Sequence, residues 1–160
     1  MQISLVAVGR LKSGPERELV ARYLDRAIAT GKPLALTGFS LKEISESRAS
    51  SAGARKADEA RQILAECADD AFVVALDERG KASSSEDFAQ LVARERDNGR
   101  RQMTFLIGGA DGLDENVRKR ADLVLAFSPL TWPHQLVRIL LCEQLYRTTT
   151  ILSGHPYHRA

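Results

Sequence analysis

Residues 71–77 read AFVVALD, a continuous apolar run that ends in an aspartate. A strand of this kind is typical of a parallel sheet with both faces covered, because neither face meets water. Residues 3–9 (ISLVAVG) have the same character and end in glycine. Residues 103–107 (MTFLI) lead directly into the turn GGADG. These three segments therefore predict the central strands of a mainly parallel sheet.

Helical patterns separate the predicted strands. Residues 15–31 carry an apolar stripe with Pro15 in the first turn and Gly31 at the end, and Ser13 with Glu16 predicts a capping box. Other helices are expected at residues 54–68, from serines 83–85 to Gly99, at 114–121 and at 133–149, with extended segments at 34–44 and 123–127. This alternation predicts an α/β fold whose parallel sheet is flanked by helices.

Length and composition indicate one domain. The chain has 160 residues, of which 44% are hydrophobic and 28% charged, close to the averages of globular proteins. We therefore expect a single domain over residues 1–160. The N-terminal segment lacks the charge order of a signal peptide, and no apolar stretch approaches the roughly 20 residues that cross a bilayer. These features predict a cytoplasmic protein that does not bind a membrane.

Positive charge is concentrated in two short runs. Residues 94–101 contain four arginines, and residues 118–120 read RKR, although the net charge of the chain is only +2. Such runs can contact phosphate. Each run taken alone is more typical of a solvated helix face.

The last predicted helix, residues 133–149, is apolar nearly all round. Its hydrophobic side chains cover well over half of the circumference: Leu136, Val137, Ile139, Leu140, Leu141, Cys142, Leu145 and Tyr146. A helix of this kind must be buried nearly all round. In a chain of this length, part of that surface is expected to meet a second subunit. We therefore expect a homodimer with this helix largely in the interface, and Leu141 among the interface positions.

Three strand ends are candidate ligand sites, because ligands of parallel α/β sheets bind beyond the carboxyl ends of strands. They are residues 76–77, the glycine turn 108–112, and residues 127–133 (FSPLTWP). The glycine pattern is neither the dinucleotide fingerprint nor a P-loop, which disfavours an NAD-type enzyme but leaves it as an alternative. In residues 127–133 two prolines stiffen the loop and Thr131 can cap the next helix, so its backbone groups could bind an adenine edge.

The C-terminal segment HPYHR, residues 155–159, is rich in functional side chains. The last six residues contain two of the three histidines of the chain. Their spacing resembles that of metal ligands, but no Cys, Asp or Glu lies beside them, so no metal site is expected. A serine hydrolase is not expected either, because the sequence has no G-x-S-x-G motif.

Three motifs in this order resemble one known family. GGADGL (residues 108–113), LTWPHQLVRILLCEQLYR (130–147) and HPYHR (155–159) are similar to the small SPOUT methyltransferases of the RlmH type. The resemblance implies a SPOUT-like α/β fold with a deep trefoil knot near the C-terminus, and homodimers packed through terminal helices. It also implies transfer of a methyl group from S-adenosylmethionine to N3 of a pseudouridine in large-subunit ribosomal RNA. A non-catalytic module of the same fold that binds RNA or the ribosome remains an alternative.

The resemblance also assigns residues to the cofactor site. The residues expected to contact S-adenosylmethionine are Leu76, Gly109, Ser128, Pro129, Leu130, Thr131, Trp132 and Pro133. At Gly109 the missing side chain is expected to leave space for the ligand. Asp111 departs from the family pattern and is expected to place a negative charge near the site.

The chemistry of N3 methylation selects the catalytic candidates. N3 of a uracil ring must lose a proton before it attacks, so a base and a cation near it would help. The candidates for these roles are His134, Arg138, His158 and Arg159, with Tyr157 expected to stack on the base or to form a hydrogen bond with it. The tail is expected to reach the cofactor pocket, either its own or that of the partner subunit.

Overall fold

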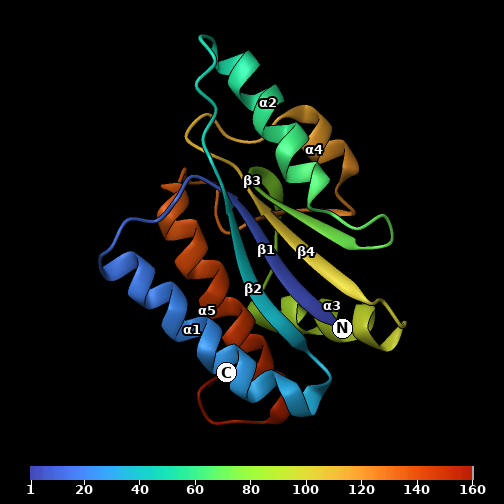
Figure 1. The fold of residues 1–160 in the computed structure, drawn as a ribbon. Coiled ribbons are helices and arrows are strands. Elements are labelled where there is room, and N and C mark those ends of the chain that lie inside the picture. Colours follow the sequence, from blue (N-terminus) through green and yellow to red (C-terminus); the bar gives the residue numbers. More distant parts are fainter. Residues whose placement is uncertain (160) are drawn as a thin grey trace.

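Strands and helices alternate along the whole of residues 1–159, the part of the chain that this computed structural model describes (Figure 1). The first half contains β1 (Gln2–Val8), α1 (Pro15–Gly31), a 3-10 turn (Lys32–Leu34), β2 (Thr37–Ile44) and α2 (Ala52–Ala65). The second half contains β3 (Phe72–Ala82), α3 (Ser85–Asp97), β4 (Gln102–Ile107), α4 (Glu115–Arg120), β5 (Leu123–Ala126) and α5 (His134–Ser153). The α/β alternation predicted from the sequence is confirmed.

The five strands form one sheet in the order β2-β1-β4-β3-β5. Every neighbouring pair is parallel, with Leu5 opposite both Leu41 and Phe105, and Phe105 opposite Val74. The apolar runs around residues 3–9, 71–77 and 103–107 thus supply the three central strands. Because all strands run the same way, their carboxyl ends lie at one edge of the sheet, where ligands of such sheets bind.

Helices cover both faces of the sheet (Figure 1). On one face, Ile3, Leu5 and Ala7 of β1 belong to a core that includes residues of α1, α3 and α5. On the other face, Val6 and Val8 pack with residues of α2 and α4. Successive side chains of a strand point to opposite faces, which explains why apolar residues occupy every position of these buried strands.

Several element ends differ from the predictions. The capping box at Ser13 is wrong: Gly14 is the N-cap of α1, without a side-chain hydrogen bond, although Pro15 does begin the helix. Ser84 does cap α3, since its side chain accepts a hydrogen bond from the Asp87 N–H at 3.0 Å. The final helix is one turn longer than predicted and ends at Gly154, whose φ of 68° suits a residue without a side chain.

β3 extends beyond the apolar run that predicted it. The strand continues to Ala82, and both Leu76 and Lys81 pair with Leu125 of β5 across an irregularity. Within this stretch a Cβ on Gly80 would lie 2.7 Å from the backbone of Val124 and Leu125. The segment after Leu76 therefore packs directly on the backbone of β5, which only glycine permits.

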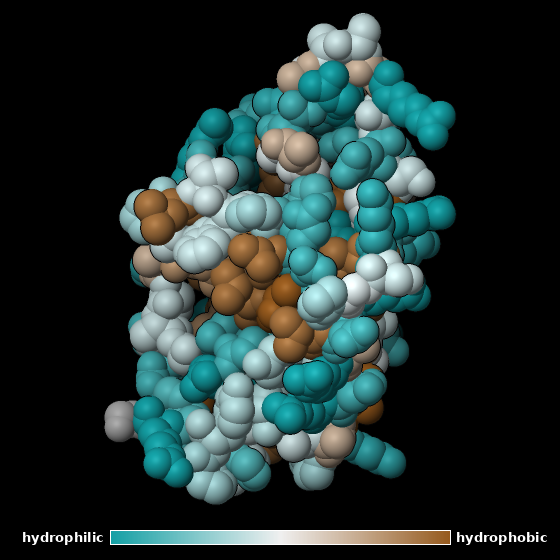
Figure 2. Space-filling model, turned by 90° about the vertical axis from the view of Figure 1, so that its left-hand side faces the viewer, coloured by the Kyte–Doolittle hydropathy of each residue, from teal (hydrophilic) through white to brown (hydrophobic). Residues whose placement is uncertain are grey.

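Part of α5 remains exposed in the single chain. Leu136 and Leu140, one turn apart, are 40% and 37% exposed, and in the preceding loop Leu130 and Trp132 are 67% and 40% exposed. The side of the molecule on which α1 and α5 lie carries a hydrophobic area among polar groups (Figure 2). Within residues 1–159, no helix has the combined length and hydropathy of a membrane span.

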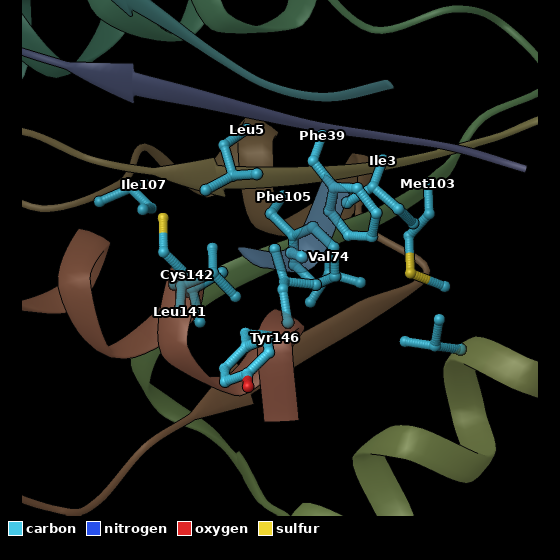
Figure 3. Close-up of a cluster of buried hydrophobic side chains, with 14 of the residues drawn as sticks. Ile3, Leu5, Phe39, Val74, Met103, Phe105, Ile107, Leu141, Cys142 and Tyr146 are labelled. Carbon is cyan, nitrogen blue, oxygen red and sulfur yellow. The ribbon is translucent and has the colours of Figure 1, made fainter. Parts of the chain in front are cut away.

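The rest of the apolar surface of α5 lies in the core of its own chain. Leu141, Cys142 and Tyr146 pack with side chains of β1 and β4 (Figure 3). Leu141 is 0% exposed, so its assignment to a subunit interface was wrong. Helices α1 and α3 and the sheet cover most of this helix, and a single stripe is left uncovered.

Candidate functional site

A cavity of about 730 Å³ lies at the carboxyl ends of the strands. Of the eight residues predicted to contact a cofactor, seven line it: Leu76, Gly109, Ser128, Leu130, Thr131, Trp132 and Pro133. Pro129 belongs to the same loop but does not line the cavity. Small-molecule sites typically have volumes of about 300–1,000 Å³, so the three strand ends together form a site of ordinary size.

The glycine turn forms one wall of the cavity. The Gly112 N–H donates to the Gly109 carbonyl at 3.0 Å, and Gly112 has a φ of +80°. A Cβ on Gly109 would lie 2.9 Å from Val8 Cγ1 and 3.2 Å from Glu59 Oε2, neither of which lines the cavity. The reason predicted for this glycine was therefore wrong: it allows the turn to pack against β1 and α2 instead of leaving ligand space.

The charge of Asp111, also in the glycine turn, is paired. Arg55 of α2 donates to both carboxylate oxygens, at 2.6 and 3.1 Å. This hydrogen-bonded guanidinium holds the pKa of Asp111 below its usual range. The negative charge expected near the site is therefore largely balanced.

Side chains fix the loop between β5 and α5. The Ser128 hydroxyl accepts hydrogen bonds from the Leu130 N–H at 3.0 Å and from Trp132 Nε1 at 2.8 Å. Thr131 Oγ1 donates to Glu78 Oε2 at 2.6 Å, which connects the loop to the segment after Leu76. The cap predicted for Thr131 is wrong, because Pro133 occupies the N-cap of α5.

Arg118 connects the remaining walls, a role that the sequence did not reveal. Its Nη1 lies 3.0 Å from Asp77 Oδ2 and 2.8 Å from the Leu113 carbonyl, so it joins β3, α4 and the glycine turn. The Asp77 and Arg118 side chains are only 9% and 15% exposed. In the sequence, Arg118 stands in a basic run typical of a solvated helix face. The sequence feature that could have indicated this ion pair was Asp77, a charged residue at the end of a buried apolar run.

His134 and Arg138, one turn apart on α5, differ in exposure. His134 is half-buried and lines the cavity. Burial and the neighbouring Arg138 cation lower the pKa of His134, which favours a neutral imidazole near pH 7. Arg138 is 0% exposed and does not line the cavity. Its guanidinium donates to Glu43 at 2.8 Å, to the Gly9 carbonyl at 3.0 Å and to the Val8 carbonyl.

The tail residues lie away from the cavity of their own chain. The Tyr157 hydroxyl donates to Glu143 at 3.0 Å, and burial with this contact raises the pKa of Tyr157 to about 12. Arg147 lies 3.3 Å from His158 Nδ1, and Glu86 lies 2.8 Å from Nε2. Arg159 is exposed. Glu143 is ten residues from Pro133, a distance of about 15 Å along a helix, so the structure does not bring the tail and the cavity of one chain together.

The cavity lies at the strand ends of a parallel sheet, beside a fixed loop that precedes the last helix. Both features are expected for the family of enzymes that the sequence motifs resemble. The family model described as "Predicted SPOUT methyltransferase" matches residues 1–158, and the chain belongs to this family. Its relatives include proteins named "Ribosomal RNA large subunit methyltransferase H". The protein of this name from Allorhizobium ampelinum is 58% identical over 160 residues, and that from Brucella anthropi is 56% identical over 160 residues. Both alignments cover 100% of each chain.

The likeness to solved structures is looser. A probable methyltransferase from Bordetella pertussis aligns with a TM-score of 0.49 and 12% identity, over 92% of this chain and 95% of that chain. At this level the alignment is too loose to carry an argument about the site.

Proposed function

We propose that the protein transfers a methyl group from S-adenosylmethionine to N3 of a pseudouridine in large-subunit ribosomal RNA. The observation that carries this proposal is the convergence of three separate strand ends on one cavity, in a chain of the SPOUT methyltransferase family. The full-length relatives named as large-subunit ribosomal RNA methyltransferases point to the same reaction.

The residues that line the cavity fit S-adenosylmethionine. Leu76, Leu125 and Val137 offer apolar surface for an adenine ring, while the fixed loop after β5 offers backbone groups for its polar edge. We propose that the eight residues predicted from the sequence form this site, with Pro129 stiffening the loop from behind. When bound, the cofactor supplies an electrophilic methyl group.

The five residues predicted to be catalytic are proposed to have separate roles, not all of them in the reaction itself. His134 lines the cavity with a lowered pKa, so it is available as a neutral base for the N3 proton. Arg138 is proposed to hold the first turn of α5 against β1 and β2, because its Nη1 and Nη2 groups already donate to Glu43 and to two backbone carbonyls. Tyr157, His158 and Arg159 of the tail are proposed to bind the target base and its phosphate.

We propose a homodimer formed through the exposed stripe of α5. Leu136, Leu140, Glu143 and Arg147 follow a spacing of three to four residues, so they lie on one face of the helix. Leu136 and Leu140 are exposed, whereas Glu143 and Arg147 bind the tail. An apolar stripe beside the cavity is the kind of surface that a second copy would cover.

A twofold pairing of this stripe would make each site composite. If two antiparallel α5 helices meet about halfway between Leu136 and Leu140, residue 143 of one chain stands opposite about residue 133 of the other. The tail bound at Glu143 and Arg147 would then lie beside the cavity of the partner. This arrangement accounts for a tail that is distant from its own cavity.

We also propose a single domain, a cytoplasmic location and a trefoil knot. The single domain over residues 1–160 is supported by the continuous sheet, and a cytoplasmic location by a ribosomal substrate. The trefoil knot is supported by membership of the SPOUT methyltransferase family.

Calorimetry and a transfer assay test the proposed function. The protein is expected to bind S-adenosylmethionine but not NAD, and to label the pseudouridine in unmethylated large subunits or ribosomes. Ser128→Ala removes the acceptor of two loop hydrogen bonds and should weaken cofactor binding about tenfold, whereas Ser153→Ala at the end of α5 should not. Binding without methyl transfer would favour the non-catalytic module, and NAD binding would favour the NAD-type enzyme.

A further inference from the structure

Three functional groups converge on Gly9, the residue that follows β1. Gly9 has a φ of +86° and is fixed to β2 by a hydrogen bond from its N–H to the Ile44 carbonyl at 2.8 Å. A Cβ on Gly9 would lie 2.8 Å from Glu46 Oε1, 3.4 Å from Arg138 Nη2 and 3.5 Å from His134 Nε2. We call these four residues the Gly9 junction. Only glycine leaves room for the three side chains.

Two members of the junction act on His134 from different elements. Arg138 lies on the same helix, and its charge is held in place by Glu43 of β2 and by two backbone carbonyls. Glu46 lies in the loop after β2, is exposed, and makes no hydrogen bond or ion pair within residues 1–159. Arg138 lowers the pKa of His134, whereas Glu46 raises it.

The charged residues that line the cavity do not include Glu46 or Arg138, and they have partners or stand on other elements. Asp77 binds Arg118, Asp111 binds Arg55, and the Glu78 carboxylate accepts the Thr131 hydroxyl. Lys56 and Arg79 line the cavity from α2 and from the segment after Leu76. Within residues 1–159, Glu46 is the carboxylate at the Gly9 junction that has no hydrogen-bond or ion-pair partner, so it acts on the His134 imidazole through its charge and not through a direct contact.

We propose that Glu46 is a positioning residue that orients His134 for proton transfer. A carboxylate near Nε2 favours the tautomer with hydrogen on Nε2, so that Nδ1 is left as the acceptor. After transfer, the same carboxylate stabilises the imidazolium. This inference rests on the proposed function and assigns a role to a residue outside the cofactor loops and the tail.

The proton transfer balances in the proposed reaction. The proton leaves N3 of the target base for Nδ1 of His134, and the electron pair left on N3 forms the bond to the methyl carbon. The electrons of the broken carbon–sulfur bond return to sulfur, which becomes a neutral thioether. Glu46 gains no bond in this sequence and acts only on the charge and orientation of the imidazole.

The variant Glu46→Gln tests the proposal, with Glu18→Gln, an exposed change on α1, as the control. The chain has only three histidines, so NMR can follow each imidazole during a pH titration, and His134→Gln assigns the signal of His134. We expect the titration midpoint of His134 to move to lower pH in Glu46→Gln, because a neighbouring negative charge is lost. The midpoints of His155 and His158 should stay unchanged.

Methyl transfer supplies the second readout. Glu46→Gln should lower kcat about tenfold, with KM for the ribosomal particle and the affinity for S-adenosylmethionine within twofold of the unaltered protein. The acid limb of the pH profile should shift in the same direction as the NMR midpoint, and Glu46→Asp should restore part of the rate.

The two readouts separate the inference from the proposed function. An unchanged midpoint of His134 in folded Glu46→Gln would overturn the inference, even if kcat falls. A shifted midpoint in a protein that never methylates ribosomal particles would support the effect of the Glu46 charge on His134 and overturn the proposed function.

Discussion

Arg138→Met should destabilise the fold far more than an arginine change elsewhere on α5. The substitution keeps a long side chain but removes the cation that contacts Glu43, the Val8 carbonyl and the Gly9 carbonyl. Arg138 is 0% exposed, so no water can replace the lost donors without a rearrangement. Removing one partner from a buried pair costs about 3–5 kcal/mol.

Each contact of Arg138 contributes to this magnitude. Two buried carbonyls that lose a donor cost about 1–3 kcal/mol each. Glu43 loses less, because its carboxylate is 26% exposed and still accepts the Leu11 N–H at 2.8 Å. The added apolar surface of methionine offsets part of the loss. We therefore expect a decrease of about 4 kcal/mol in the free energy of unfolding, near the middle of the range of about 2–6 kcal/mol that the two carbonyls give.

Urea unfolding followed by circular dichroism measures this loss. Arg147→Met is the matched control. Arg147 is the other arginine of α5 and also forms an ion pair with a glutamate, here Glu143, but its side chain is 25% exposed. This variant should lose about 1 kcal/mol or less of the free energy of unfolding. If Arg138→Met unfolds with a loss below about 1 kcal/mol and only methyl transfer fails, Arg138 is a catalytic cation and the structural role is refuted.

Three other predictions concern the fold, the dimer and the tail. Gly80→Ala should lower the free energy of unfolding by about 1–3 kcal/mol, because the new methyl group meets the backbone of β5; equal urea midpoints would contradict the close packing. Leu140→Glu should weaken the dimer at least about 100-fold by burying a carboxylate in the interface. Sedimentation would measure this, and a monomeric unaltered protein at micromolar concentration would contradict the dimer. Deletion of residues 155–160 should abolish methyl transfer but keep cofactor binding. Mixing this deletion with His134→Gln should restore about a quarter of the activity, since half of the dimers would carry one complete site; no restoration would contradict a composite site.

The sequence by itself determined the fold class and the members of the cavity wall. Apolar runs without alternation occur only where both faces of a strand are covered, so residues 71–77 predicted a parallel sheet from local pattern alone. Parallel strands end at one edge, which made the glycine turn and the loop 128–133 candidate ligand sites. The residues of one cofactor site were predicted from the resemblance of the sequence motifs to the SPOUT methyltransferases.

Only the tertiary structure decided what individual polar side chains do. Arg138 and Arg118 look in the sequence like free cations, yet both are held by carboxylates and carbonyls from distant strands and turns. Gly109 is required by the packing of Val8 and Glu59 behind it. The tail residues Tyr157 and His158 pack against Glu143 and Arg147 of α5, away from the cavity of their own chain. These contacts join residues separated by up to 130 positions along the chain, and no local pattern specifies which distant group will stand opposite a given side chain.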